Sequence, residues 1–264
     1  MTTITPTGLE QIAAMFASAK TQQRAAFLPY FPIGYPTYGQ SLDMIAAMAD
    51  AGANGFEIGV PFSDPLADGP TIQAATQVAL ENGITMRHCL AAVAELRARS
   101  IEQPMLLMSY LNPVLAYGPE ALVYDAQAAG VQGLVVPDLP PEESAVLAEV
   151  CAQEGLANVC FLAPTSNDAR IQLVAERATG FIYAVSVTGV TGARAELPAE
   201  VPDFIARVRT HTDKPLVLGF GISQAEQARQ MDTLVDGYIV GSALVRAANE
   251  SVDTVRELAA ALRG

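Results

Sequence analysis

Short apolar runs alternate along the chain with longer stretches in which apolar residues recur at helical spacing. Eight of the short runs predict strands. They are residues 27–34, 55–60, 104–110, 133–138, 157–164, 180–187, 215–222 and 236–242. The stretches between them are rich in Ala, Leu and Glu and predict helices. The clearest are residues 40–51, 87–99, 120–129, 141–154 and 225–231.

Strands that alternate with helices indicate a parallel sheet, and eight such units fit a (β/α)₈ (TIM) barrel. Two further helices are predicted outside this alternation, at residues 8–24 before the first strand and residues 71–80 after the second. An open doubly wound sheet is the rival α/β fold, but the first strand is not followed by a Gly-x-Gly-x-x-Gly motif. No linker or internal repeat interrupts the chain, so residues 1–264 are predicted to form a single domain.

Composition narrows the classes of function. Of the 264 residues, 51% are apolar and 16% are charged, which is enough apolar sequence for a large core. The net charge is −13, from 15 basic and 28 acidic residues, without a basic stripe. Nucleic acid is therefore not an expected partner. An anionic ligand would have to be held by backbone N–H groups.

Location can also be predicted. No apolar stretch reaches the roughly 18 residues that a membrane helix requires. The first residues lack the basic and apolar regions of a signal peptide. The three cysteines, Cys89, Cys151 and Cys160, are odd in number and have no paired close spacing. A reduced cytoplasmic protein with no membrane association is the simplest account.

One carboxylate lies inside a strand-like run. Glu57 is in the second predicted strand, flanked on the same face by Gly55 and Gly59. Burying an ionised carboxylate is costly unless it is paired or used. The two glycines leave space beside the acid, which suggests an active site. The alternative is a buried acid neutralised by an arginine.

A second carboxylate follows in the loop after this strand. Asp68 precedes Gly69, so by itself it would be read as a turn residue. Catalytic groups of a (β/α)₈ barrel lie at the carboxyl ends of the strands, which is where both acids are expected. Burial should raise the pKa of Glu57 and let it donate as well as accept a proton. Together, Glu57 and Asp68 are predicted to be an acid–base pair.

Glycine-rich strand ends come late in the chain. Residues 188–192, 219–221 and 241–242 follow the last three predicted strands. Such ends, with a helix after them, are the usual phosphate site of a barrel because backbone N–H groups point at the oxygens. Ordinary tight turns are the alternative. Tyr110, Asn112 and Asp138 end the third and fourth strands and are candidates for lining a pocket; Tyr183 could face the pocket or the core.

Several other chemistries are excluded by position. Lys20 and Lys214, the two lysines, precede strands and therefore lie at the wrong end for a Schiff base. His211 is on the same side, and His88 falls in a predicted helix. Neither histidine suits a triad or a metal centre at the mouth, and no metal site is predicted.

The motifs now match a known family. Residues 56–73, reading FEIGVPFSDPLADGPTIQ, resemble the signature of the tryptophan synthase alpha chain. Further matches occur in family order and cover nearly the whole chain. They are residues 110–113, 137–140, 189–192, 219–223 and 241–242.

The resemblance implies a lyase that cleaves indole-3-glycerol phosphate into indole and glyceraldehyde 3-phosphate. It assigns Glu57 as the general acid–base group and Asp68 as the second catalytic carboxylate. It places the phosphate at Gly192, Gly221, Gly241 and Ser242. It also places Tyr30, Tyr110 and Tyr183 around the substrate.

The resemblance further implies a partner, a beta chain that uses pyridoxal phosphate, in an α₂β₂ complex. No cofactor is expected in this chain. Asp64, Pro65 and Asp138 match positions that contact or signal to the partner. Residues 189–196 match a mobile lid, and Val187 replaces an arginine found in some members.

Two other functions are kept as alternatives. One is a different phosphate-binding barrel enzyme, such as a sugar-phosphate isomerase or epimerase. Such enzymes would need a histidine, lysine or metal at the mouth. The other is a non-catalytic regulatory subunit, which the presence of both Glu57 and Asp68 argues against.

Overall fold

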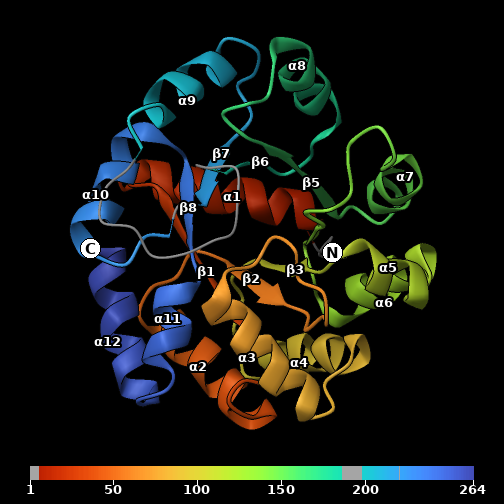
Figure 1. Ribbon diagram of the computed structural model, residues 1–264, viewed down its shortest axis with the longest axis vertical. Coiled ribbons are helices and arrows are strands. Elements are labelled where there is room, and N and C mark those ends of the chain that lie inside the picture. The colour runs from red at the N-terminus through yellow and green to blue at the C-terminus, as the bar shows by residue number, and fades with distance from the viewer. Residues whose placement is uncertain (1–5, 186–197, 220) are drawn as a thin grey trace, which may run out of the picture.

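The computed structural model describes residues 6–185, 198–219 and 221–264. Eight parallel strands form a closed barrel in sequence order, and β1 pairs with β8 to complete it (Figure 1). The strands are β1 (Ala26–Pro32), β2 (Phe56–Gly59), β3 (Met105–Met108), β4 (Gly133–Val135), β5 (Ala157–Leu162), β6 (Ile182–Val185), β7 (Leu216–Gly219) and β8 (Gly237–Val240). The predicted (β/α)₈ barrel is confirmed, and each predicted run overlaps one strand.

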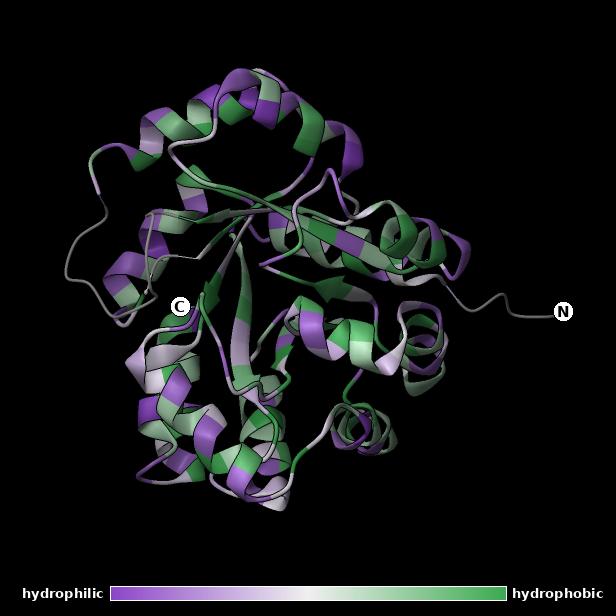
Figure 2. Ribbon diagram, turned by 45° about the vertical axis from the view of Figure 1, so that its right-hand side comes forward, coloured by the Kyte–Doolittle hydropathy of each residue, from purple (hydrophilic) through white to green (hydrophobic). Residues whose placement is uncertain are grey.

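Helices surround the barrel. They are α1 (Gly8–Thr21), α2 (Tyr38–Asp50), α3 (Pro70–Glu81), α4 (Met86–Ala98), α5 (Leu111–Tyr117), α6 (Pro119–Ala129), α7 (Ala145–Gln153), α8 (Asp168–Arg177), α9 (Val201–Arg209), α10 (Ala225–Leu234), α11 (Ser242–Ala247) and α12 (Val252–Arg263). Hydrophobic and hydrophilic residues alternate along these helices (Figure 2), and most of the large hydrophobic ones are buried. None of these described helices is both long and apolar enough to span a bilayer.

The additional helices predicted from sequence are present. Helix α1 begins with a capping box, in which the Thr7 side chain and Glu10 satisfy each other's backbone N–H groups. It lies across the amino-terminal end of the barrel, where its residues Ile12, Met15 and Phe16 approach glycines at or just before three strands. Helix α3 follows β2 as predicted. This arrangement closes one end of the barrel and leaves the other for the site.

Four glycines between helices and strands have positive φ values. Gly52, Gly130, Gly155 and Gly180 have φ values of 94°, 91°, 68° and 77°, which a side chain would disfavour. Gly130 caps α6 in the left-handed conformation. At each of these glycines the chain leaves a helix and turns toward the next strand.

All eight strands are shorter than predicted, and helix α7 starts later than predicted. Strand β3 ends at Met108 and β4 at Val135, so Tyr110 and Asp138 lie beyond the strand ends. Helix α7 starts at Ala145, four residues later than predicted, because residues 141–143 form a turn. The pattern of apolar residues does not show these boundaries. A strand ends where hydrogen bonds within a loop replace those to the neighbouring strand.

Helix α5 was not predicted. Its sequence contains Asn112 and Pro113, which were read as the end of a strand and a loop. Proline is tolerated in the first turn of a helix because its missing N–H would have no intrahelical partner there. Asn112 is therefore a helical residue, and the prediction that it ends strand β3 is wrong.

Candidate active site

Glu57 lies in β2, two residues before the strand ends. Its register partners are Tyr30 on β1 and Leu106 on β3, so these side chains share the interior face of the barrel. The Glu57 side chain is buried, with the residue only 4% exposed. The site is therefore built on a rigid strand, with the acid pointing into the barrel near its carboxyl end.

The space beside Glu57 is filled by the protein. A Cβ atom on Gly59 would lie 2.4 Å from the Tyr30 hydroxyl oxygen, and one on Gly55 would lie 2.8 Å from the Met15 sulfur. The glycines thus accommodate Tyr30 and helix α1. The suggestion that they leave the space open for another molecule is wrong at these two positions, because side chains from distant segments occupy it.

The electrostatic environment of Glu57 favours its protonated form. Burial, followed by the nearby Asp68 charge, raises the pKa of Glu57 from 4.5 to about 8. Neither cause is an arginine. In the part of the chain that the structure describes, Glu57 takes part in none of the ion pairs. The alternative of an arginine-neutralised core acid is not supported.

Asp68 lies between β2 and α3 and is also buried, at 6% exposure. Its backbone N–H donates to the Pro65 carbonyl at 3.0 Å, so it is a turn residue as well as a site residue. Its carboxyl Oδ2 accepts a hydrogen bond from the Tyr110 hydroxyl at 3.0 Å. Burial raises the pKa of Asp68 to about 6, and the Tyr110 hydrogen bond opposes this rise.

The two acids therefore differ in charge at neutral pH. With pKa values of about 8 and about 6, Glu57 holds its proton while Asp68 is ionised. Such a difference between neighbouring carboxyls is how acid and base roles are separated in one site. The pair can donate a proton from one group while the other stabilises positive charge.

Two tyrosines flank the acids. Burial and then the negative charges of Asp68 and Glu57 raise the pKa of Tyr30, so its hydroxyl stays protonated. Tyr183 on β6 feels the same two charges and stacks on Phe161 of β5 with ring centroids 4.6 Å apart. Phe161 was missed from sequence because an aromatic residue in a strand is usually a core residue. Its register with Tyr183 places it on the interior face.

The predicted phosphate residues lie at the ends of the last two strands. Gly221 has a φ of 79°, Gly241 precedes α11, and Ser242 begins that helix with its side chain buried. The first amide groups of a helix have no intrahelical acceptor, so they are free to bind an anion. Gly192 lies outside the described residues, as do Val187 and the predicted lid at residues 189–196.

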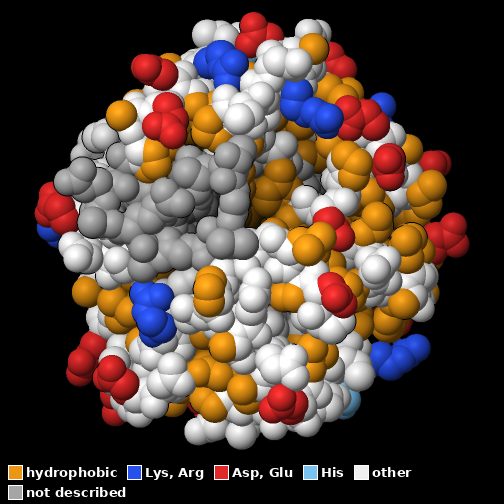
Figure 3. Space-filling model, viewed as in Figure 1, with side chains coloured by type: hydrophobic (Ala, Val, Ile, Leu, Met, Phe, Trp, Pro, Cys, Tyr) orange, Lys and Arg blue, Asp and Glu red, His pale blue; other side chains and the backbone are white. Residues whose placement is uncertain are grey.

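Two glycines of these strand ends also make room for tyrosines. A Cβ atom on Gly219 would lie 2.6 Å from the Tyr183 ring, and one on Gly241 would lie 3.1 Å from the Tyr30 ring. The Tyr30 and Tyr183 rings therefore need glycine at these strand ends in order to occupy their positions. The face of the molecule in Figure 3 has a hollow with hydrophobic side chains along one side of it.

The predicted partner residues lie on loops at the surface. Asp64 is exposed and accepts a hydrogen bond from the Ser63 hydroxyl at 2.5 Å, and Pro65 is half-buried. Leu66 in the same loop is 81% exposed. Asp138 is exposed and accepts a hydrogen bond from the Leu111 N–H at 2.8 Å. These residues are within reach of a partner.

The lysine and histidine positions agree with their exclusion from the mouth. Lys214 donates to the carbonyls of Ala175 and Ala178, at 2.7 Å and 2.6 Å, just before β7. The His88 ring caps the start of α4. His211 lies 3.9 Å from the Asp168 carboxyl, between α9 and β7. The contacts of these three side chains are with helix ends and loops away from the two acids.

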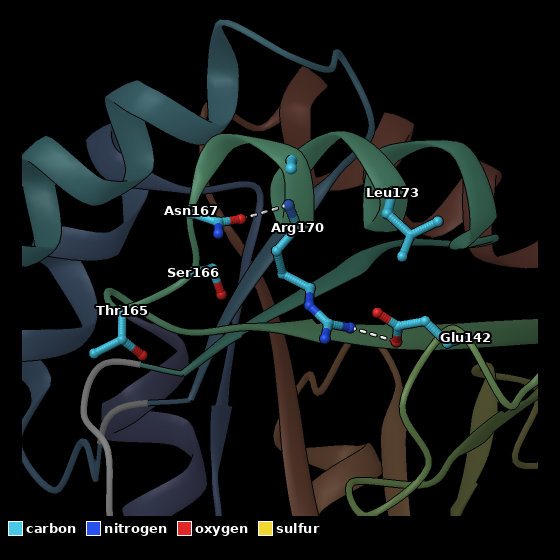
Figure 4. A pocket seen from close by; sticks show the side chains of 7 residues that line it. Glu142, Thr165, Ser166, Asn167, Arg170 and Leu173 are labelled. Atoms are coloured by element: carbon cyan, nitrogen blue, oxygen red, sulfur yellow. Dashed lines mark hydrogen bonds and ion pairs between the residues drawn. The ribbon is translucent and has the colours of Figure 1, made fainter.

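A separate groove of about 500 Å³ lies beside α8 (Figure 4). Glu142 and Arg170 form an ion pair across it at 2.6 Å. Both side chains are well exposed, and such pairs contribute about 0–1 kcal/mol. None of the predicted site residues lines this groove, so it is distinct from the carboxyl pair.

Together, the closed parallel barrel and the two buried interior acids with raised pKa values are typical of a (β/α)₈ enzyme. Comparison with known proteins identifies the family to which this chain belongs. Residues 16–263 match the family model described as tryptophan synthase alpha chain. The chain belongs to the tryptophan synthase alpha chain family.

Individual relatives agree with this membership. The alpha chain of Roseiflexus castenholzii is 49% identical, over 92% of this chain and 93% of its own length. That of Chloroflexus aurantiacus is also 49% identical, over 90% and 89%. A Mycobacterium tuberculosis tryptophan synthase structure matches with a TM-score of 0.90 at 38% identity, covering 95% of this chain and 96% of that one.

The function follows from the family. The chain is the alpha subunit that cleaves indole-3-glycerol phosphate in tryptophan biosynthesis, and a tryptophan synthase beta chain is its partner. The relatives do not support the two alternatives, a sugar-phosphate isomerase and a regulatory subunit.

Proposed function

We propose that Glu57 carries both proton transfers of the lyase reaction and that Asp68 stabilises the intermediate between them. The observation that carries this proposal is the pair of buried carboxyls, which are 4% and 6% exposed and whose pKa values are both raised, that of Glu57 more than that of Asp68. A reaction that first donates and then accepts a proton needs a group of intermediate basicity. Glu57 has this property, and its strand position fixes its direction.

In the first step, protonated Glu57 gives its proton to C3 of the indole ring. The ring becomes an electron-poor indolenine whose N–H donates a hydrogen bond to the Asp68 carboxylate. In the second step, the Glu57 carboxylate takes the proton of the side-chain hydroxyl next to the breaking bond. The oxygen forms a carbonyl, the carbon–carbon bond breaks, and its electrons return to the ring. Indole and glyceraldehyde 3-phosphate are released, and Glu57 is protonated again.

The remaining site residues are proposed to hold the substrate. Gly192, Gly221, Gly241 and Ser242 bind the phosphate through backbone N–H groups and one hydroxyl. This suits a chain with a net charge of −13, because the binding groups are not lysine or arginine side chains. Tyr30, Tyr110 and Tyr183 surround the rest of the substrate, supported by their positions around the two acids.

The direct test is to mix the purified chain with indole-3-glycerol phosphate, with and without the beta chain, and to follow indole. We expect slow release from the chain alone and faster release in the complex. If no indole forms in either mixture, the proposed chemistry is refuted.

The pH dependence follows from the two pKa values. We expect kcat/KM to fall below pH about 6 as Asp68 is protonated, and above about pH 8 as Glu57 loses its proton. Because the acids interact, the two midpoints belong to the pair. The profile is measured by following indole release at each pH. A kcat/KM that is constant between pH 5 and 9 would contradict the roles proposed for Glu57 and Asp68.

We also propose the partner surface and its setting. The beta chain docks on residues 63–68 and near Asp138 in an α₂β₂ complex, and the partner supplies the pyridoxal phosphate. Leu66 is 81% exposed in the middle of this segment, so a partner that docks there would cover its side chain. Residues 1–264 fold as one domain in the cytoplasm, consistent with three free buried cysteines.

Leu66→Asp tests this surface. We expect the variant to keep the activity of the isolated chain and to lose most of the activation by the beta chain, because a buried unpaired charge disfavours the complex. Tyr124→Asp, at a second exposed apolar residue on α6, is the matched control. Equal activation of both variants in a titration with the beta chain would place the partner elsewhere.

A further inference from the structure

Tyr110 lies at the junction of three segments of the mouth. It follows β3, precedes α5 and is 1% exposed. Its ring packs against Phe62, with ring centroids 5.4 Å apart. The next residue, Leu111, donates its N–H to the Asp138 carboxyl at 2.8 Å. The backbone and ring of Tyr110 are therefore fixed from both sides.

The hydroxyl of Tyr110 makes two hydrogen bonds to one loop. It accepts from the Ala67 N–H at 3.1 Å and donates to Asp68 Oδ2 at 3.0 Å. The backbone of Asp68 is also held, because its N–H donates to the Pro65 carbonyl at 3.0 Å and the Gln73 side chain donates to its carbonyl oxygen at 2.7 Å. The carboxyl of Asp68 thus depends on Tyr110 for its direction, while Gln73 holds the chain behind it.

Among the described residues, those just before Asp68 make few other contacts outside their own loop. Leu66 is 81% exposed, and its N–H bonds within the loop, to the Asp64 carbonyl at 2.9 Å. A loop whose side chains are exposed and whose bonds are internal opens at low cost in free energy. The bond from Ala67 to Tyr110 joins this loop to the end of a barrel strand.

We propose that Tyr110 is a positioning residue, whose hydroxyl holds the loop at residues 63–68 against the barrel and aims the ionised Asp68 carboxyl at the substrate. This inference rests on the proposed role of Asp68 and adds the group that sets it. A hydrogen bond to an ionised carboxylate favours the charged form, in which Asp68 accepts the indole N–H. The Tyr110 hydroxyl thus controls both the direction and the charge of the Asp68 carboxyl.

The other groups around Asp68 do not replace this bond. Glu57 of β2 faces it and is protonated at neutral pH, and the Tyr30 and Tyr183 phenols of β1 and β6 feel its charge. The cause that lowers the pKa of Asp68 is the Tyr110 hydrogen bond, against the larger opposing effect of burial. Removing the hydroxyl should therefore raise that pKa.

Tyr110→Phe tests the proposal, because phenylalanine keeps the ring on Phe62 and removes only the hydroxyl. We expect kcat to fall about tenfold with KM changed less than about twofold, since the lost bond is to a charged group. The acidic limb of the kcat/KM profile should move to higher pH by about half a unit or more. Amide hydrogen exchange in residues 64–68 should become faster in the isolated chain.

Tyr117→Phe is the matched control. The Tyr117 hydroxyl also donates to a carboxylate, that of Asp125, but on the outside of the barrel. It should leave the pH profile and the exchange unchanged. In an Asp68→Asn background, Tyr110→Phe should lower kcat much less than in the wild type, because the charged partner is gone.

An unchanged acidic limb together with unchanged exchange in Tyr110→Phe would overturn the proposal. So would an equal loss of kcat in the wild-type and Asp68→Asn backgrounds. If the wild-type chain releases no indole either with or without the beta chain, the proposed function fails, whereas the exchange measurement still decides whether Tyr110 holds the loop.

Discussion

Glu57→Gln is expected to abolish indole release, with a loss in kcat of at least about 10⁴-fold. The same carboxyl serves two proton transfers, each worth about 10²–10⁴ in rate. Glutamine has nearly the same shape but cannot donate a proton to C3 or accept one from the hydroxyl. Substrate binding should persist, because the phosphate is held elsewhere. Single-turnover assays and a binding titration separate these two effects.

The stability of Glu57→Gln provides an internal check. The pKa of Glu57 is raised in the folded state, from 4.5 to about 8, so its favourable contribution is present at low pH. It is lost as pH rises from about 4.5, where the carboxyl of the unfolded chain ionises, to about 8, where the buried group ionises as well. The variant has no such loss, so its melting temperature relative to the wild type should be higher at pH 9 than at pH 5.

A surface substitution of the same kind is the control. Glu226→Gln changes a carboxyl that is well exposed and paired with Arg229 on α10, and it should leave kcat and the pH dependence of stability as they are. Wild-type-like turnover in Glu57→Gln would remove Glu57 from the mechanism. A melting-temperature difference that is independent of pH would instead show that Glu57 is not buried in its neutral form.

Asp68→Asn should lower kcat by about 10²–10³-fold, which is the usual effect of removing one preorganised group that stabilises charge in the transition state. The asparagine oxygen can still accept the Tyr110 hydrogen bond, so the loop should stay in place. The negative charge that stabilises the indolenine N–H is lost. Because this charge acts on the intermediate, KM should change less than kcat.

The pH profile of Asp68→Asn distinguishes the loss of the Asp68 charge from a general disruption of the site. The Asp68 charge is one of the causes that raise the pKa of Glu57. Removing it should move the alkaline limb of kcat/KM to lower pH, and the acidic limb due to Asp68 should disappear. Asp253→Asn, on the exposed face of α12, is the control and should keep both limbs. Full activity with both limbs retained in Asp68→Asn would show that this carboxyl has no catalytic role.

The sequence by itself determined the architecture. Alternating apolar periodicities of strand and helix are local properties, so the eight units and the additional helices before β1 and after β2 could be predicted. The position of Glu57 inside a strand and of Asp68 in the following loop also came from local sequence. Because a parallel barrel places all strand ends of one kind at one rim, these residues could be assigned to the mouth.

Only the tertiary structure decided what surrounds the acids. The Tyr110 hydroxyl reaches Asp68 across 42 positions of sequence, and the Tyr30 ring fills the space at Gly59 from a neighbouring strand. Helix α5 appeared where the sequence indicated a strand end. The raised pKa values arise from burial by segments that are distant in sequence, and no local pattern carries that information. The physical reason is that periodicity reports the face on which a side chain lies, whereas its charge depends on every group packed against it.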